Sequence, residues 1–155
     1  MDTSISKHQK NVSSVIHLST FSKYFIPFGN FIIPLIIWTS NKDKWSYIDE
    51  NGKQAINFQI SILLYSIFIG VLMIPLVLFT AWEFIGLDIL KHNAHQVNFN
   101  FSDISLFGWN AGIFGVLGVL GVALFVVDIF CTIIATIKAY DGEVYQYPFS
   151  IKFIK

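Results

Sequence analysis

Arginine is absent from this sequence, and charged residues of any kind are scarce. All ten basic residues are lysines, ten aspartates and glutamates balance them, and charged residues make up only 13% of the chain. Soluble domains carry about 25% charged residues, so the composition favours a protein whose surface faces lipid. A net charge of zero creates no field that attracts nucleic acid, and without arginine the chain lacks the planar fork that binds phosphate bidentately. We therefore expect no nucleic-acid partner.

Cysteine and the common catalytic motifs are also in short supply. The single cysteine, Cys131, lies in an apolar run, which excludes an internal disulfide and indicates a packing role. The N-terminus has neither the apolar core nor the cleavage site of a signal peptide. The sequence contains no nucleophile motif, phosphate-binding glycine loop or zincin signature. Asp88, His92 and His95 lie close in sequence but are too few for a structural zinc site. We therefore expect a protein that is not an enzyme. We expect it to have no catalytic residues, no cofactor and no cofactor-binding residues, and no metal.

Hydrophobic residues, by contrast, make up 54% of the chain and gather in long runs. Residues 55–82 contain no charged side chain, and residues 109–137 contain one, Asp128. Each run exceeds the roughly 20 residues that cross a bilayer as a helix. The sequence therefore predicts an all-α integral membrane protein with two long antiparallel transmembrane helices, at 54–83 and 109–138.

A shorter hydrophobic segment precedes these helices. Tyr24 to Trp38 is fifteen residues long and is interrupted by prolines and a glycine, so a helix there falls short of the hydrocarbon core. Upstream, apolar residues at near-helical spacing predict an amphipathic helix at 13–25 lying in the membrane interface. Two alternatives stay open for residues 24–40: a re-entrant hydrophobic helix, which pairs 13–25 with 28–40 in a hairpin and which we favour, or a third full span.

The lysines predict the topology. The loop 41–53 has three, and three more, Lys138, Lys152 and Lys155, lie at and beyond the end of the second span, whereas the loop 84–108 has one, Lys91. The positive-inside rule then places the first loop and the tail in the cytoplasm and the loop 84–108 outside. The whole chain, 1–155, reads as a single multi-pass membrane domain.

Polar residues form a stripe on each predicted span. A spacing of four residues puts Asn57, Ser61 and Tyr65 on one face of the first span, and Asp128 and Thr132 on one face of the second. A carboxylate at this depth costs about 2.5–3.5 kcal/mol on insertion scales, so Asp128 must face protein. We expect a protonated Asp128 that donates a hydrogen bond towards Ser61 and Tyr65. A proton or solute pathway is the alternative.

Glycines recur every three residues along the second span. They define what we call the glycine ridge: Gly112, Gly115, Gly118 and Gly121. Small residues at this spacing are typical of close helix packing in membranes. A flexible gating element is the alternative.

Three phrases, read together, carry a family resemblance: HLSTFSKYFIPFGNFIIPLIIW at 17–38, IDENGKQAINFQ at 48–59 and IIATIKAYDGEVYQYPFSIKFI at 133–154. Their order and spacing resemble a family of small bacterial membrane proteins of unknown function, distantly similar to the Tic protein of about twenty kilodaltons in the chloroplast inner-envelope import machinery. The positions that look like its signature are His17, Pro34, Gln54, Asn57, Lys138, Gly142, Glu143 and Pro148. The resemblance implies the bacterial inner membrane and a loose association with protein translocation, but no activity.

Two classes of function follow. The first is a non-enzymatic subunit or scaffold of a membrane complex, with the lipid bilayer and other membrane subunits or further copies of the chain as partners. The second is a small oligomeric channel or carrier for protons or a small solute that uses Asp128. Two or three helices seldom enclose a pore, so the second class requires oligomerisation around a shared axis.

Overall fold

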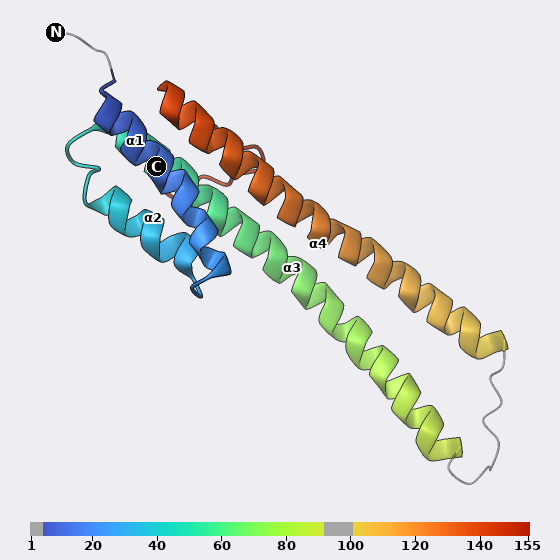
Figure 1. Ribbon diagram of the computed structural model, residues 1–155. Coiled ribbons are helices and arrows are strands. Elements are labelled where there is room, and N and C mark those ends of the chain that lie inside the picture. Colours follow the sequence, from blue (N-terminus) through green and yellow to red (C-terminus); the bar gives the residue numbers. More distant parts are fainter. Residues whose placement is uncertain (1–4, 92–100) are drawn as a thin grey trace. The chain divides into compact units, whose positions relative to one another are not determined.

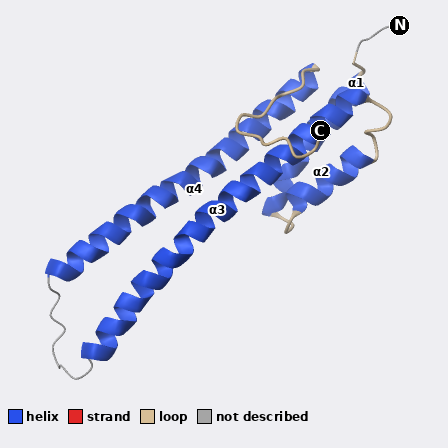
Figure 2. Ribbon diagram, turned by 180° about the vertical axis from the view of Figure 1, so that it is seen from behind, coloured by secondary structure: helices blue, strands red, loops and turns tan. Residues whose placement is uncertain are grey.

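The computed structural model describes residues 5–91 and 101–155, and the side chains of 5–82 and 108–155. In these ranges all regular secondary structure is helical (Figures 1 and 2). The elements are α1 (Lys7–Ser19), the 3-10 helix η1 (Thr20–Tyr24), α2 (Gly29–Thr39), α3 (Ser46–Lys91) and α4 (Phe101–Asp141). An extended tail follows α4. The chain divides into two compact units: unit 1 comprises Met1–Leu64 and Phe125–Lys155, and unit 2 comprises Tyr65–Leu124.

The first helix starts earlier than the apolar spacing predicts. Ser6 caps α1 by accepting a hydrogen bond from the backbone N–H of Gln9, whose side chain accepts in return from the backbone of Ser6. This reciprocal capping box satisfies two otherwise unpaired donors. Helix α1 therefore begins at Lys7 rather than at residue 13, and it ends at Ser19, where η1 replaces the α-helix predicted to run to residue 25.

Helix α2 follows a tight turn. Phe28 adopts a left-handed conformation with φ 59°, and a Cβ at Gly29 would come within 2.9 Å of the Ser22 backbone. Only glycine allows this close approach. The helix keeps nearly the predicted bounds, 28–40, and its 11 residues rise about 16 Å, roughly half of a bilayer core. This length supports the re-entrant alternative, which remains a prediction.

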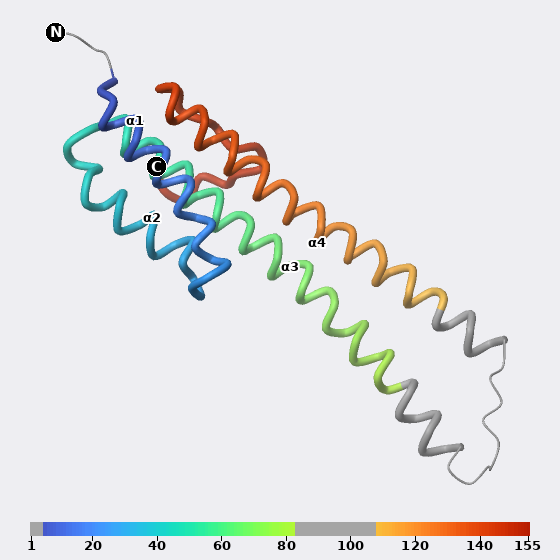
Figure 3. The backbone as a smooth tube through the Cα atoms, viewed as in Figure 1, coloured from blue at the N-terminus to red at the C-terminus, as the bar shows by residue number. Residues whose placement is uncertain are grey.

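The two long helices extend beyond their predicted bounds. Helix α3 begins at Ser46, so residues 46–53, predicted as a loop, form its first turns. Helix α4 runs from Phe101 to Asp141, which exceeds 109–138 at both ends. Figure 3 follows the chain through both helices. Asp88, His92 and His95 carry the metal alternative, but the side chain of Asp88 and both histidines lie outside the described residues.

Both helices are long and apolar enough to cross a membrane. The candidate spans are Ser46–Trp82 and Gly108–Asp141, with mean hydropathies of 2.7 and 2.6 over their most apolar windows. None of the first window and only 11% of the second is buried. Core helices of soluble proteins bury such stretches, so these exposed apolar surfaces fit a lipid environment.

Unit 1 has an interior rich in polar side chains. Two apolar clusters lie within it, one around Ile16, Trp38 and Ile48 and one around Phe58 and Cys131. The buried polar and charged side chains of this unit are Ser13, Ser14, His17, Thr20, Asn51, Asn57, Gln59, Ser61, Asp128 and Thr132. Apolar residues, in contrast, cover much of its outside. An apolar outside around an interior that contains many polar side chains suits a protein surrounded by hydrocarbon.

The described helices of unit 2 are segments of α3 and α4. Leu117 and Asn110 are its buried side chains among the described residues. The glycine ridge lies on α4 in this unit, and a Cβ added at any of its four glycines would meet no described atom within 4 Å. The ridge is thus open rather than packed against this unit's own described side chains.

Candidate functional site

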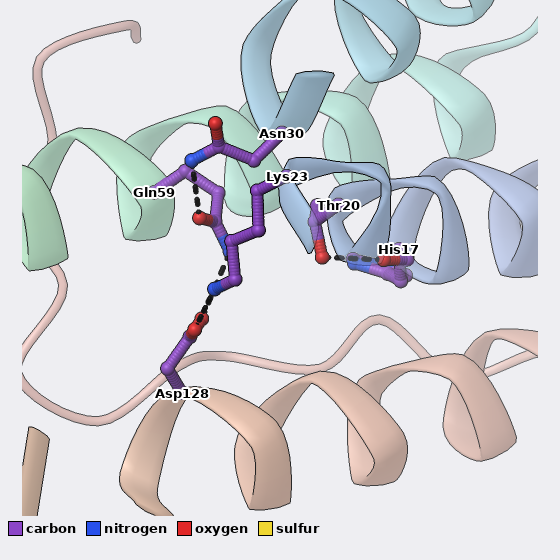
Figure 4. A network of polar contacts seen from close by, with 6 residues as sticks. All are labelled: His17, Thr20, Lys23, Asn30, Gln59 and Asp128. Carbon is purple, nitrogen blue, oxygen red and sulfur yellow. Dashed lines mark hydrogen bonds and ion pairs between the residues drawn. The ribbon is translucent and has the colours of Figure 1, made fainter. Parts of the chain in front are cut away.

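The polar interior of unit 1 joins four helical elements through one carboxylate. Asp128 on α4 accepts a hydrogen bond from the Gln59 amide of α3 at 3.0 Å and forms an ion pair with Lys23 of η1. Gln59 in turn accepts from the Asn30 amide of α2 at 2.9 Å (Figure 4). We call Lys23, Asn30, Gln59 and Asp128 the Asp128 network. Both carboxylate oxygens of Asp128 are engaged, and its side chain is 4% exposed.

The partners of Asp128 differ from those predicted. Ser61 donates to the carbonyl of Asn57 at 2.8 Å and accepts from the backbone N–H of Ile151 at 2.8 Å. Tyr65 belongs to unit 2 and is not placed relative to Asp128. The structure places the Lys23 ammonium and the Gln59 amide against Asp128 instead of Ser61, so the expected partner is wrong. Asp128 does face protein, as its depth requires.

The stripe on α3 holds the C-terminal tail. The Asn57 carbonyl oxygen accepts from the backbone N–H groups of Phe153 and Ile154 at 3.1 and 2.9 Å, and its amide donates to the carbonyl of Ile154 at 2.9 Å. Together with the Ser61 bond, these contacts pair an extended chain with side chains of a helix. The spacing of four between Asn57 and Ser61 therefore serves the tail.

A second polar centre surrounds His17. Its Nε2 lies 3.0 Å from Oδ1 of Asn51, and its Nδ1 lies 2.9 Å from the hydroxyl of Tyr147. The Asn51 amide nitrogen donates to the carbonyl of Tyr47, so its oxygen must face His17. Because that oxygen only accepts, Nε2 carries the proton and Nδ1 accepts from Tyr147.

Burial sets the protonation of this centre. His17 is fully buried, and this desolvation lowers its pKa from 6.5 to about 4, although the hydrogen bond to Asn51 acts in the opposite direction. Burial also raises the pKa of Tyr147 well above its ordinary value. The histidine is therefore neutral and the phenol protonated at pH 7, as the hydrogen bonds require.

The end of α4 completes unit 1. Gly142 has φ 98°, a left-handed conformation that ends the helix as the sequence predicts. Lys138 pairs with Glu143 at 2.5 Å and lowers the pKa of that exposed carboxyl. Tyr47 donates to the carbonyl of Ala139 at 2.8 Å. Contacts 47 to 139 and 59 to 128 run in opposite directions, so α3 and α4 are antiparallel here.

The remaining predicted residues lie in or around this unit. Thr132 and Pro34 are buried, Gln54 is partly buried, and Pro148 is exposed. Sequence reasoning missed Lys23, Asn30 and Gln59. Lys23 had a signal: a cation beside an apolar segment needs a counter-charge, and Asp128 is the one charge inside the second apolar run. Asn30 and Gln59 lie in the segments that carry the family resemblance, but no polar spacing connected them with Asp128.

The polar contacts of the site connect the helices of unit 1 to one another. The described residues contain no group of three or more His, Cys, Asp or Glu that could hold a metal ion. The polar atoms named above bond to each other and to backbone groups, which in hydrocarbon substitutes for hydration.

The structure is that of a helical membrane protein. Its apolar surfaces face outwards, two of its helices are able to span a bilayer, and its charged network faces inwards. The chain matches the model of the magnetosome magnetite crystal formation protein family over residues 8–154, and it belongs to this family. It is thus a bacterial membrane protein, as the small-family resemblance implied. No curated protein and no solved structure matches it. The similarity to the chloroplast Tic protein gains no support from these comparisons and stays a prediction.

Proposed function

We propose that this protein is a non-enzymatic subunit or scaffold of a complex in the magnetosome membrane, where it supports magnetite crystal formation through the proteins it holds. The family description supplies the setting. The open glycine ridge carries the proposal, because a Cβ at each of its positions meets no described atom within 4 Å. Small residues let helix backbones approach closely, and in lipid such packing drives association in place of the hydrophobic effect.

The neighbours of the ridge fit a helix partner. Val116, Val119 and Val122 flank the glycines and are more than half exposed. β-branched side chains have few rotamers to lose when a helix packs on them. A second copy of the chain or another membrane subunit can occupy this surface.

Asp128 supports the scaffold over the carrier. Its two oxygens are held by Lys23 and Gln59, which suits a fixed brace better than a group that exchanges protons. A link to protein translocation rests on the Tic resemblance alone and stays a prediction.

The test replaces glycines of the ridge. Gly115→Leu with Gly118→Leu fills the open surface, so cross-linking or co-purification with partner chains from native membranes should be lost while insertion persists. Gly70→Leu on α3 is the matched control, since a Cβ there also meets nothing within 4 Å but Gly70 lies outside the ridge. Unchanged association of the double variant would refute the proposal.

A further inference from the structure

The hairpin formed by α1, η1 and α2 has the dimensions of one bilayer leaflet. We infer that residues 7–39 are a wedge embedded in the cytoplasmic leaflet alone, and that the chain therefore prefers membrane in which this leaflet is convex. The partner is the lipid bilayer itself. The inference depends on the membrane embedding in the proposed function but not on any protein partner.

The tip of the hairpin is strongly apolar and exposed. Phe25, Ile26 and Phe28 are 86%, 50% and 69% exposed. Presenting three large apolar side chains to water at one turn is unfavourable by roughly 1.5–3 kcal/mol each. Hydrocarbon is the environment that removes this cost.

The opposite end of α2 suits the headgroup region. Lys42 lies over the ring of Trp38 at 5.5 Å, and Lys44 lies over the ring of Trp45 at 5.9 Å. Tryptophan and lysine gather where hydrocarbon meets water. Between this end and the tip, α2 rises about 16 Å, close to half of the roughly 30 Å core. The tip then reaches about the bilayer midplane.

Both hairpin helices turn apolar side chains outwards. Val15 and Leu18 of α1 and Ile32 and Ile36 of α2 are about half exposed. Among the polar side chains of α1, Ser13, Ser14 and His17 are buried in unit 1, whereas Lys7, His8 and Asn11 in its first turns are exposed. Lipid contact along the hairpin, as well as at its tip, explains why these apolar side chains face outwards.

The Asp128 network fixes the hairpin at this depth. Lys23 joins η1 to α4, and Asn30 joins α2 to Gln59 on α3. Figure 4 shows the side chains from the hairpin meeting those of the two long helices. If the hairpin left this position, Asp128 would be buried without its counter-charge. Moving the hairpin therefore costs free energy.

The two halves of α3 have different surroundings. Ser46–Leu64 shares unit 1 with the hairpin and the tail, and the helices described in unit 2 are segments of α3 and α4. Because the hairpin belongs to unit 1, it adds protein to the leaflet that contains it and not to the other. Nine of the ten lysines fall within unit 1, so the positive-inside rule makes this the cytoplasmic leaflet.

Sorting between a giant vesicle and a thin tube pulled outwards from it tests the wedge. The protein carries Cys131→Ala and Lys155→Cys, is reconstituted at low density and is labelled with a membrane-impermeant maleimide dye. Only copies with the tail outside then fluoresce, and their hairpins lie in the convex leaflet of the tube. We expect these copies to be denser in the tube than in the vesicle, increasingly so as the tube narrows.

Copies of the opposite orientation provide the sharpest control. They are labelled with a permeant dye after the outer cysteines are blocked, and the wedge predicts that the tube depletes them. Phe25→Ser with Ile26→Ser should weaken enrichment, whereas Ile67→Ser with Phe68→Ser, an equally apolar exposed pair in unit 2, should not. If the tip variant does not fold, the two wild-type orientations still decide. Equal density in tube and vesicle for both orientations, or the same preference for both, would overturn the inference and leave association through the glycine ridge untouched.

Discussion

At the scale of single residues, hydrogen-bond donors and acceptors are matched around His17. Asn51 fixes which ring nitrogen carries the proton, and Tyr147 supplies a donor to the other nitrogen. The low pKa of His17 comes from its burial, which disfavours the charged ring, while the hydrogen bond to Asn51 acts in the opposite direction.

This lowered pKa makes stability depend on pH. Between about pH 6.5 and pH 4 the unfolded chain binds a proton at His17 that the folded chain does not, so stability is full above pH 6.5 and falls as the pH drops through this window. The total loss is on the order of 3 kcal/mol. Thermal unfolding in mild detergent should show Tm decreasing from pH 7 to pH 4.5. His17→Gln should flatten the slope, and an unchanged slope would disprove the assignment.

The Lys23–Asp128 ion pair allows a second prediction at this scale. Lys23→Met leaves a carboxylate that is 4% exposed without its counter-charge and should destabilise the protein by about 2–3 kcal/mol, less than a fully buried pair costs because Lys23 is partly exposed. Asp128→Leu should also destabilise. The double variant should recover much of the loss, since no lone charge remains. Denaturation of the four proteins gives the coupling, and additive losses would contradict the pairing.

At the scale of elements, the end of α4 depends on one glycine. Gly142 combines φ 98° with close contact to the Lys10 side chain, whose Cε would lie 2.8 Å from an added Cβ. The same lysine donates to the carbonyl of Asp141 at 2.9 Å, so α1 packs against this turn. Because the end of the Lys10 side chain can move aside, it is the backbone conformation that selects glycine here.

Gly142→Ala should therefore destabilise the protein by about 1–2 kcal/mol. Gly121→Ala is the control, because Gly121 is helical and open, and alanine favours a helix by up to about 1 kcal/mol. The two substitutions should shift Tm in opposite directions. A Gly142→Ala protein as stable as the parent would show that the turn does not need the left-handed conformation.

The elements were largely predictable, and their partners were not. Apolar runs predict both long helices, and the length of the first apolar segment predicts α2. Ser6 and Gln9 have the spacing of a capping box, but the residues around them lack a clear apolar periodicity, so the sequence did not indicate a helix start there. The role of Asn57 could not be inferred, because binding of an extended tail depends on contacts between residues about a hundred positions apart. The pairing of Lys23 with Asp128 could not be predicted without knowing that η1 places Lys23 beside α4.

At the scale of the whole molecule, the topology depends on which segments cross the bilayer. Two spans with a hairpin in one leaflet leave the N-terminus and the tail on the same side, whereas a third span separates them. The contact of Lys10 with Asp141 agrees with the first arrangement, because the start of α1 then lies beside the end of α4.

Thiol labelling of intact cells tests most directly whether the first hydrophobic segment crosses the membrane. Single cysteines at Asn11 and Lys155, both exposed, and at Gln96 in the loop predicted to be external are introduced into a Cys131→Ala background. With a membrane-impermeant reagent, Gln96→Cys should react in intact cells, while Asn11→Cys and Lys155→Cys should react only after the membrane is permeabilised. Reaction of Asn11→Cys in intact cells, with Lys155→Cys still protected, would mean that the first hydrophobic segment crosses the membrane and would contradict the account.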